Sequence, residues 1–307
     1  MSTEKIGNVI LDLSLYQGTD LYSDGEIEDR LLETVKNHTP DQYSEIIAKE
    51  KSWPFLYHLS FTRGNIIEWL PELENANVLE IGSGCGAVTP FIAKHAKKVT
   101  CVELSEKRSL INAHRNRDAE NIEIKVGNFQ DIEKNLTEKF DVITLIGVLE
   151  YAQSYISGNT PYESFLCMLK KHLAKDGKIV IAIENRLGMK YWAGCKEDHE
   201  GTYFSGIEGY NNSKVKTFSK KGLEQLLESC GLSHKFYYPY PDYKFPVSIY
   251  SDDFLPQAGE LKRNTNHYDQ DRVVAFDEFA AFNNVIKDGL FPEFSNSFLV
   301  ISEMEEM

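Results

Sequence analysis

The sequence predicts an α/β fold in which a mostly parallel sheet is covered by helices. Two observations predict it. From residue 77 onward, short apolar runs alternate with segments of helical pattern, and no internal repeat or low-complexity linker breaks that order. Repeated strand–helix units place successive strands parallel and pack the helices against the sheet. The chain has 307 residues, of which 42% are hydrophobic and 26% charged, so it can bury a substantial core.

The first 75 residues are expected to form a mainly helical extension or lid after an irregular start. Apolar residues recur at helical spacing between Ile27 and Val35. A further helix is expected to open at Trp53-Pro54, and Pro71 closes an apolar helical stripe over residues 66–70.

Seven runs have the short apolar composition of buried strands, at residues 77–82, 98–104, 121–127, 140–151, 177–185, 234–241 and 296–303. Helical patterns lie between them, at residues 87–96, 105–116, 162–174 and 218–231. Ser105 and Ser219 are expected to cap two of these helices, because a serine hydroxyl can accept a hydrogen bond from an amide of the first turn.

Two segments fit this alternation poorly, residues 186–217 and residues 242–295. Segments of this length in a compact domain are usually functional. We therefore predict two cap-like inserts on a domain made of residues 76–241 and 296–307.

The charge balance excludes some partners. With 33 basic and 47 acidic side chains, the formal net charge is −14. Non-specific binding to nucleic acid depends on Lys and Arg at phosphates, so neither nucleic acid nor an anionic membrane is an expected partner. None of the five cysteines has the spacing of a zinc site, so reduced thiols and no metal are expected. No secretory leader and no run of about 20 apolar residues is evident, which predicts a soluble, cytoplasmic protein.

The most informative stretch is VLEIGSGCGA at residues 78–87. Gly82, Gly84 and Gly86 let the backbone turn tightly and approach a ligand, and the helix that follows directs free amides at the same place. The pattern fits a dinucleotide pyrophosphate or a different ligand. Glu80 disfavours the pyrophosphate, because a carboxylate repels phosphate but accepts hydrogen bonds from an ammonium group. Glu103 ends the second strand, 21 residues after Gly82, where an acid can bind both hydroxyls of a ribose.

Four stretches in this order resemble the motifs of class I S-adenosylmethionine (SAM)-dependent methyltransferases: VLEIGSGCG, CVEL, FDVITLIGVLEYA and KHLAKDGKIVIAIEN. The resemblance covers roughly residues 55–240 and the last strand. It implies a Rossmann-like, seven-stranded, mostly parallel sheet with helices on both faces and an antiparallel last strand. It also implies that SAM is the cofactor and that it binds across the strand ends.

The resemblance places eleven residues at the cofactor: Glu80, Gly82, Ser83, Gly84, Glu103, Leu104, Asn128, Phe129, Ile146, Gly147 and Arg63. The glycine turn would pack on the methionine half, with Glu80 at its amino end. Glu103 would bind the ribose, and Leu104, Asn128 and Phe129 would border the adenine.

Three of these eleven residues need a further remark. Many family members have Asp where this chain has Asn128, although an amide oxygen can make the same contact. Ile146 and Gly147 would lie under the reactive end. Arg63 would pair with the cofactor carboxylate, or be an exposed helix charge.

The acceptor side gives weaker signals. GVLEYA lacks the Asn/Asp-Pro-Pro-aromatic signature of enzymes that methylate amide or exocyclic amine nitrogens, which argues against adenine and glutamine as acceptors. The favoured catalytic residues are His199 and Glu184. Other candidate bases follow the strands or lie in the extension: Glu150, Tyr151, Asn185, Arg186 and His58.

The inserts are rich in aromatic side chains, which suit sugar rings or aromatic acceptors, or join the inserts to the sheet. The stretches ENRLGMKYWAG, EDHEGTYFSGIEGY, YYPYPDYKFP and DQDR also resemble bacterial methyltransferases associated with surface-polysaccharide glycosyltransferases. The predicted function is methyl transfer to a small molecule, favouring a hydroxyl of a sugar or other metabolite. The alternatives are a protein or RNA methyltransferase, a non-catalytic SAM-binding partner subunit and, last, a dehydrogenase.

Overall fold

The chain forms two compact units. The computed structural model describes residues 3–20, 22–211, 213–264 and 270–305. Unit 1 comprises Met1–Leu145 and Met168–Ile179, and unit 2 comprises Ile146–Cys167 and Val180–Met307. Helix α8 (Pro161–His172) and strand β7 (Leu173–Glu184) each begin in one unit and end in the other. Asp269, the first residue of the DQDR stretch, lies outside the described residues.

The structure confirms the α/β class, but it has ten strands rather than the seven predicted. The seven predicted strands are β3 (Asn77–Ile81), β4 (Lys98–Glu103), β5 (Ile122–Val126), β6 (Phe140–Ile146), β7, β8 (Leu232–Tyr240) and β10 (Ser297–Met304). The additional strands are β1 (Thr3–Ile6), β2 (Val9–Asp12) and β9 (Ser248–Ser251). Each of these three has four residues, too few to show a clear alternation, and β1 is exposed along most of its length.

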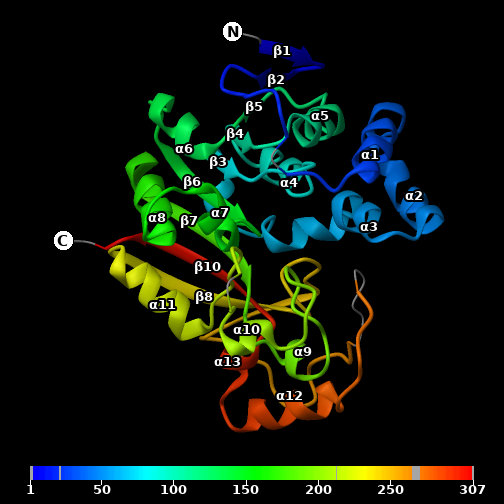
Figure 1. Cartoon of the computed structure of the whole chain (residues 1–307), viewed down its shortest axis with the longest axis vertical. Coiled ribbons are helices and arrows are strands. Elements are labelled where there is room, and N and C mark those ends of the chain that lie inside the picture. Colours follow the sequence, from blue (N-terminus) through cyan, green and yellow to red (C-terminus); the bar gives the residue numbers. More distant parts are fainter. Residues whose placement is uncertain (1–2, 21, 212, 265–269, 306–307) are drawn as a thin grey trace. The chain divides into compact units, whose positions relative to one another are not determined.

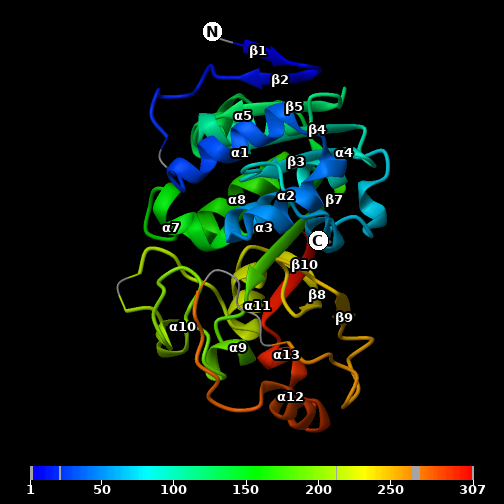
Figure 2. The same ribbon diagram turned by 90° about the vertical axis from the view of Figure 1, so that its right-hand side faces the viewer.

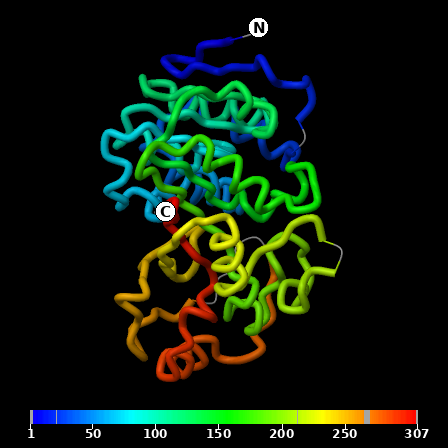
Figure 3. Tube along the Cα trace, turned by 90° about the vertical axis from the view of Figure 1, so that its left-hand side faces the viewer, coloured from blue at the N-terminus to red at the C-terminus, as the bar shows by residue number. Residues whose placement is uncertain are grey.

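In unit 1 the strands follow the order β1-β2-β5-β4-β3-β6, continued by the first half of β7 (Figure 1). Strand β3 is parallel to β4 and β6, while β4 and β2 are both parallel to β5. Strands β1 and β2 form an antiparallel hairpin, which Figure 3 shows in dark blue at the outer edge of unit 1. Because parallel strands end at the same edge, residues that follow β3, β4 and β5 gather there.

Helices cover both faces of the unit 1 strands. Helix α5 (Glu106–Arg115) packs against β2, β4 and β5, and α4 (Thr89–Ala93) and α6 (Phe129–Ile132) both contact β4. Figure 1 shows α5 and α6 on opposite sides of these strands. The Ser105 hydroxyl accepts a hydrogen bond from the Arg108 amide at 3.2 Å, which confirms it as the N-cap of α5.

Three helices follow the N-terminal hairpin: α1 (Glu26–Asn37), α2 (Tyr43–Glu50) and α3 (Trp53–Leu59). Leu31 and Val35, four residues apart on α1, share one buried cluster with Phe55 and Leu59 of α3 and Ile111 of α5. Figure 2 shows α1 lying alongside α5. Burial of this apolar stripe fixes the helices on unit 1.

Unit 2 contains the second half of β7, followed in the sheet by β10, β8 and β9. Strand β10 is antiparallel to β8, as predicted for the last strand, with Leu299 opposite Tyr237. Helix α11 (Lys220–Ser229) contacts β8. The Ser219 hydroxyl caps α11 by accepting from the Gly222 amide at 3.2 Å, which confirms the second predicted cap.

Both predicted inserts lie in unit 2. The first contains α9 (Met189–Trp192) and α10 (Ser205–Glu208), and the second contains β9, α12 (Glu278–Lys287) and α13 (Phe291–Phe294). Backbone hydrogen bonds of 3.0 Å join the inserts, from the Val273 amide to Gly194 and from the Ala275 amide to Ala193. A short helix, α7 (Ala152–Tyr155), precedes α8. It stays a prediction that the inserts form a cap and that residues 1–75 form a lid.

Within the described ranges, no helix is both long enough and apolar enough to cross a membrane.

Candidate functional site

The glycine turn, residues 82–86, has a backbone conformation that favours glycine. Gly82, Gly84 and Gly86 have φ angles of 67°, 52° and 73°, in the left-handed region. A Cβ on Gly86 would lie 2.4 Å from Asn112 Oδ1, so packing also requires a glycine there. At Gly84 the nearest atom to an added Cβ is Arg108 Nη1 at 4.0 Å, which leaves space beside this part of the turn.

Glu103, at the end of β4, is bonded to the glycine turn. Its Oε2 accepts a hydrogen bond from the Gly84 amide at 2.8 Å, and its Oε1 accepts one from the Ser105 amide at 3.0 Å. Burial raises the pKa of Glu103, although the charge of Arg108 and the amide hydrogen bonds act in the opposite direction. Leu104 follows and is half-buried. The turn and the acid are therefore one structural unit.

Glu80, in β3, is a buried carboxyl with few partners. Its Oε2 accepts hydrogen bonds from the Thr89 hydroxyl at 2.7 Å and from the Cys101 thiol at 3.4 Å. Burial raises the pKa of Glu80 to about 7, against the lowering effect of these two donors. A cation placed beside this group would favour its charged form.

The segment between β2 and α1 and the first turn of α1 add further charges beside the glycine turn. Arg108 of α5 pairs with Glu28 at 2.7 Å and with Asp24 at 2.5 Å. Asp20 accepts a hydrogen bond from the Ser105 hydroxyl at 2.9 Å. These contacts fix the segment at the N-terminal end of α5.

Asn128 and Phe129 follow β5, as the sequence predicts. The Asn128 side-chain oxygen accepts from the Gln130 amide at 2.9 Å and caps α6. The Phe129 ring is buried and lies in a T-shaped arrangement with the His172 ring, at a centroid separation of 6.5 Å. Both residues lie after β5 at the edge where the glycine turn follows β3, although Asn128 already serves as a cap.

Arg63 is 2% exposed, so the alternative of an exposed helix charge is wrong. Its guanidinium lies over the Tyr57 ring, 4.4 Å from the centroid. His58, one of the candidate bases, also lies in unit 1, with Nε2 3.8 Å from Asp24 Oδ2. Burial lowers the pKa of His58.

Ile146 and Gly147 lie in unit 2, whereas the other nine predicted cofactor residues lie in unit 1. The Gly147 amide donates to the Ala182 carbonyl at 2.9 Å. A φ of 70° and a Cβ position only 2.7 Å from the Tyr243 hydroxyl both favour glycine at this residue.

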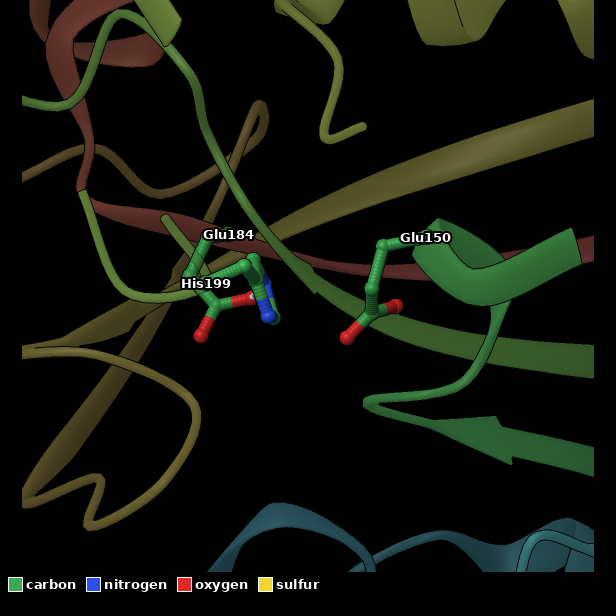
Figure 4. A group of neighbouring side chains, drawn as sticks. All are labelled: Glu150, Glu184 and His199. Atoms are coloured by element: carbon green, nitrogen blue, oxygen red, sulfur yellow. Dashed lines mark ion pairs between the residues drawn. The ribbon is translucent and has the colours of Figure 1, made fainter. Parts of the chain in front are cut away.

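Three side chains of unit 2 converge in what we call the carboxylate–histidine cluster: Glu150, Glu184 and His199 (Figure 4). Glu150 lies in the short 3₁₀ helix η5 (Leu149–Tyr151), Glu184 ends β7, and His199 lies in the first insert. His199 Nε2 is 3.6 Å from Glu184 Oε2, and one ligand-type atom of each residue lies within 4.8 Å of the others. The Tyr151 hydroxyl lies 3.1 Å from His199 Nδ1, so the opposite ring nitrogen points toward Glu184.

Two buried lysines adjoin this cluster. Lys244 Nζ lies 2.8 Å from Glu184 Oε1 and also pairs with Asp198. Lys190 Nζ lies 2.9 Å from Asp198 Oδ2 and 3.7 Å from Asp242 Oδ2. Each lysine is thus shared between two carboxylates.

The protonation of the cluster is far from that of free side chains. Burial and the charge of Glu184 raise the pKa of Glu150 to about 8. Burial would raise the pKa of Glu184, but the charges of Lys244 and His199 hold it well below its usual range. Burial would lower the pKa of His199, but the nearby Glu184 carboxylate raises it to about 9. A buried imidazole with a carboxylate partner can accept and hold a proton.

Comparison with known protein families shows which family the chain belongs to. Residues 58–234, more than half of the chain, match the family described as methyltransferase domain. The chain belongs to this methyltransferase family. These residues therefore form a methyltransferase domain. The methyl donor of such domains is SAM.

Individual relatives of this methyltransferase are distant. The chain is 28% identical over 112 residues to the ribosomal RNA small subunit methyltransferase A of Streptococcus pyogenes serotype M5 (strain Manfredo). That match covers 33% of this chain and 39% of the relative's length.

Solved structures with a similar fold have low sequence identity. A SAM-dependent methyltransferase from Archaeoglobus fulgidus is 14% identical, with a TM-score of 0.48 and coverage of 78% of this chain and 91% of that chain. The N-methyltransferase NodS from Bradyrhizobium japonicum WM9 is also 14% identical, with a TM-score of 0.46 and coverage of 80% and 94%.

The residues of this methyltransferase at the glycine turn fit SAM. Gly84 leaves open space where a side chain would stand, and Glu103 lies directly beside that space. Glu80 offers a buried carboxyl for an ammonium group. The site thus contains two carboxylates and a glycine backbone without side chains, which the amino acid and ribose parts of the cofactor need.

Sequence reasoning favoured Glu184 and His199 as catalytic residues, and the structure brings the two side chains together; their catalytic role stays a prediction. It left Glu150 as one candidate among several and missed Lys244 and Asp198. The sequence signals for these two residues are weak. Asp198 lies in the acidic run EDHE and Lys244 in the aromatic stretch DYKFP, and neither stretch has a spacing typical of a functional site. Two other candidates have structural partners, since Asn185 donates to the carbonyls of residues 293 and 295 and Arg186 donates to those of residues 206 and 207.

Proposed function

We propose that this methyltransferase transfers the methyl group of SAM to a hydroxyl oxygen of a small polar acceptor, a sugar or another metabolite. One observation carries the proposal: a buried imidazole, His199, has Nε2 3.6 Å from the buried carboxylate Glu184 and is oriented through Nδ1 by Tyr151. A hydroxyl nucleophile gains from a positioned base, whereas a thiol or an amine needs less help.

On the cofactor side, the proposal assigns roles to residues at the ends of β3 and β4. The backbone of Gly82, Ser83 and Gly84 would pack on the methionine half, Glu80 would hold its ammonium group, and Glu103 would accept from the ribose hydroxyls. When bound, SAM supplies an electrophilic methyl group on a sulfonium.

The other predicted cofactor residues are proposed for the remaining parts of the ligand. Leu104, Asn128 and Phe129 would border the adenine. Arg63 would pair with the carboxylate, and Ile146 and Gly147 would lie at the reactive end.

On the acceptor side, His199 would receive the proton of the hydroxyl as its oxygen becomes the nucleophile. Glu184 would stabilise the imidazolium that results, and Tyr151 would hold the ring so that Nε2 stays available. The neutral imidazole starts this step, and its share grows as the pH rises toward about 9. Positioned general bases contribute typically 10²–10⁴-fold to rate.

The choice of a sugar as acceptor rests on the aromatic side chains of the inserts. Trp192, Tyr203 and Phe204 are 40%, 40% and 44% exposed, whereas Tyr191 and Tyr210 are buried. The exposed rings offer flat apolar faces to a sugar ring, and the buried ones hold the insert together. An acceptor from surface-polysaccharide synthesis is the finer form of this proposal, supported by the motifs of the two inserts.

A second candidate is RNA, because the partial relative in Streptococcus pyogenes acts on ribosomal RNA by name. The net charge of −14 opposes it, since RNA binding needs cationic side chains at phosphates.

A transfer assay with labelled SAM tests the proposal and separates the two acceptors. The full chain is incubated with a panel of sugars and nucleotide sugars, with a metabolite extract, and with ribosomal RNA. We expect label on a small molecule as an alkali-stable ether, and at least 100-fold less in E184Q. Label only on RNA, or on nothing despite tight SAM binding, would contradict it.

A further inference from the structure

The carboxylate–histidine cluster has a feature that general-base catalysis alone does not explain. Glu150 is 1% exposed, and neither of its carboxylate oxygens has a hydrogen-bond partner among the described residues. His199 Nε2 is buried and likewise has no such partner. Buried polar groups are nearly always hydrogen-bonded, and each exception needs an explanation, of which a bound ion is one.

Buried acids of the described residues outside the cluster have partners, and within it Glu184 makes no hydrogen bond but pairs with Lys244 at 2.8 Å. Glu103 accepts two backbone hydrogen bonds, Glu80 accepts from a hydroxyl and a thiol, and Glu278 pairs with Arg272 at 2.9 Å. Glu150 therefore differs from its counterparts: its carboxylate makes no hydrogen bond and no ion pair among the described residues, and it lies beside two other ligand-type side chains (Figure 4).

Charge balance points in the same direction. Lys244 pairs with Glu184 and Asp198, and Lys190 pairs with Asp198 and Asp242. Among the described residues, no ion pair joins Glu150 to a cationic side chain. A cation bound beside Glu150 would favour the charged form of this buried carboxyl.

The orientation of the imidazole is also that of a metal ligand. Ligating histidines usually bond through one ring nitrogen and make a hydrogen bond with the other. His199 has Nδ1 at 3.1 Å from the Tyr151 hydroxyl, which leaves Nε2 on the side of the two glutamates.

From this geometry we propose that Glu150, Glu184 and His199 form a binding site for one divalent transition-metal ion. Two carboxylate oxygens and one imidazole nitrogen suit Mn²⁺ or Zn²⁺ better than an all-oxygen or a thiolate set would. The spacing of the cysteines had led to the expectation of no metal, but this site uses none of them.

The cation would leave coordination positions for a ligand oxygen, because the protein supplies three donors only. Its role there rests on the proposed function: a cation lowers the pKa of a hydroxyl bound to it, so the acceptor would pass its proton to water before methyl transfer. His199 would be a ligand when the cation is bound and the base when it is absent. Lys244 would then keep its pairing with Asp198.

Metal binding is measured without SAM and without an acceptor. The full chain is stripped with a chelator and titrated with Mn²⁺ alone, followed by calorimetry and by the loss of the free-Mn²⁺ signal in electron paramagnetic resonance. We expect one Mn²⁺ per chain, competition by Zn²⁺, and nitrogen hyperfine coupling from one imidazole.

Two variants and one control decide whether this is the site. E150Q keeps the shape of the side chain and removes its charge, and H199Q removes the nitrogen ligand; each should weaken Mn²⁺ binding at least tenfold. E278Q removes another buried carboxylate of unit 2, outside the cluster, and should leave binding unchanged. Because E150Q could perturb folding, loss of nitrogen coupling in H199Q provides an independent readout.

No binding up to millimolar Mn²⁺, or equal binding by E150Q, H199Q and the wild type, would overturn the inference. Transfer activity that is full in the presence of chelator, together with absent Mn²⁺ binding, would reject the metal and leave the proposed function intact. Mn²⁺ binding at this site with no transfer to any hydroxyl acceptor would support the metal and reject the function.

Discussion

The glycine turn of unit 1 comes from five consecutive residues, whereas the carboxylate–histidine cluster of unit 2 draws Glu150, Glu184 and His199 from three separate segments. The turn acts mainly through its backbone: its amides bond to Glu103 and to the carbonyl of Val102. The cluster acts through side chains alone. A backbone site tolerates changes around it, while a site of convergent side chains depends on each member.

The largest expected effect is on the cluster. H199Q should lower kcat by about 10²–10⁴-fold, because it removes the proposed base or ligand. The affinity for SAM should stay within about twofold of the wild type, because His199 is assigned to the acceptor and not to the cofactor. Calorimetry and single-turnover transfer assays measure the two quantities, with H114Q on the half-buried surface of α5 as control. An equal loss of SAM affinity would show that the two regions are not functionally separate.

A smaller effect is expected from Glu80, as a dependence of stability on pH. Its pKa is about 7 in the folded protein against 4.5 for the free side chain. The folded state thus binds more protons between these values, and the contribution of Glu80 to stability is full below pH 4.5 and lost as the pH rises through 7. The loss should reach about 3 kcal/mol.

Denaturant unfolding at several pH values between 5 and 8 measures this contribution. E80Q should lack this part of the pH dependence and should still bind SAM less tightly than the wild type. Parallel stability curves for the two proteins would contradict the raised pKa.

Next in size is Glu103. E103A removes the acceptor of the Gly84 amide and the proposed acceptor of the ribose hydroxyls. Hydrogen bonds to a charged group contribute about 1.5–3 kcal/mol, so the Kd for SAM should rise about 10–100-fold. The neighbouring E106A, in the first turn of α5, is the matched control. An unchanged Kd in E103A would remove the assignment of this acid to the cofactor.

The smallest effects are expected from a matched pair of helix caps, one in each unit. S219A removes one hydrogen bond to the Gly222 amide of α11 and should cost about 1 kcal/mol of unfolding free energy. S105A should cost more, about 2 kcal/mol, because Ser105 also donates to Asp20. Denaturant unfolding with two spectroscopic probes measures both, and a larger loss in S219A would reverse the expected order.

The same contrast explains what the sequence could predict. The seven longer strands and the two serine caps leave local signals, because apolar runs and capping residues act on their own neighbours. The hairpin β1–β2 and strand β9 do not, since four residues that depend on a partner strand have no pattern of their own. The prediction therefore missed β1 and β2 at one edge of the ten-stranded sheet and β9 at the other.

Candidate residues follow the same rule. Glu80, the glycine turn and Glu103 form one motif with fixed spacing, and the structure places them together. Lys244 and Asp198 are 46 positions apart and meet only when the two inserts fold against each other. Burial decides such pairs, and burial is a property of the whole unit rather than of a short segment.

The hairpin at the edge of unit 1 has a consequence for solubility. A bare sheet edge presents unpaired N–H and C=O groups on which another chain can add a strand. Here β2 covers β5, and the outermost strand β1 is short and carries Glu4 and Lys5 in the middle. We therefore expect residues 3–12 to limit self-association through strand pairing. A chain without them would expose the edge of β5, to which a strand of another copy of the chain could bind.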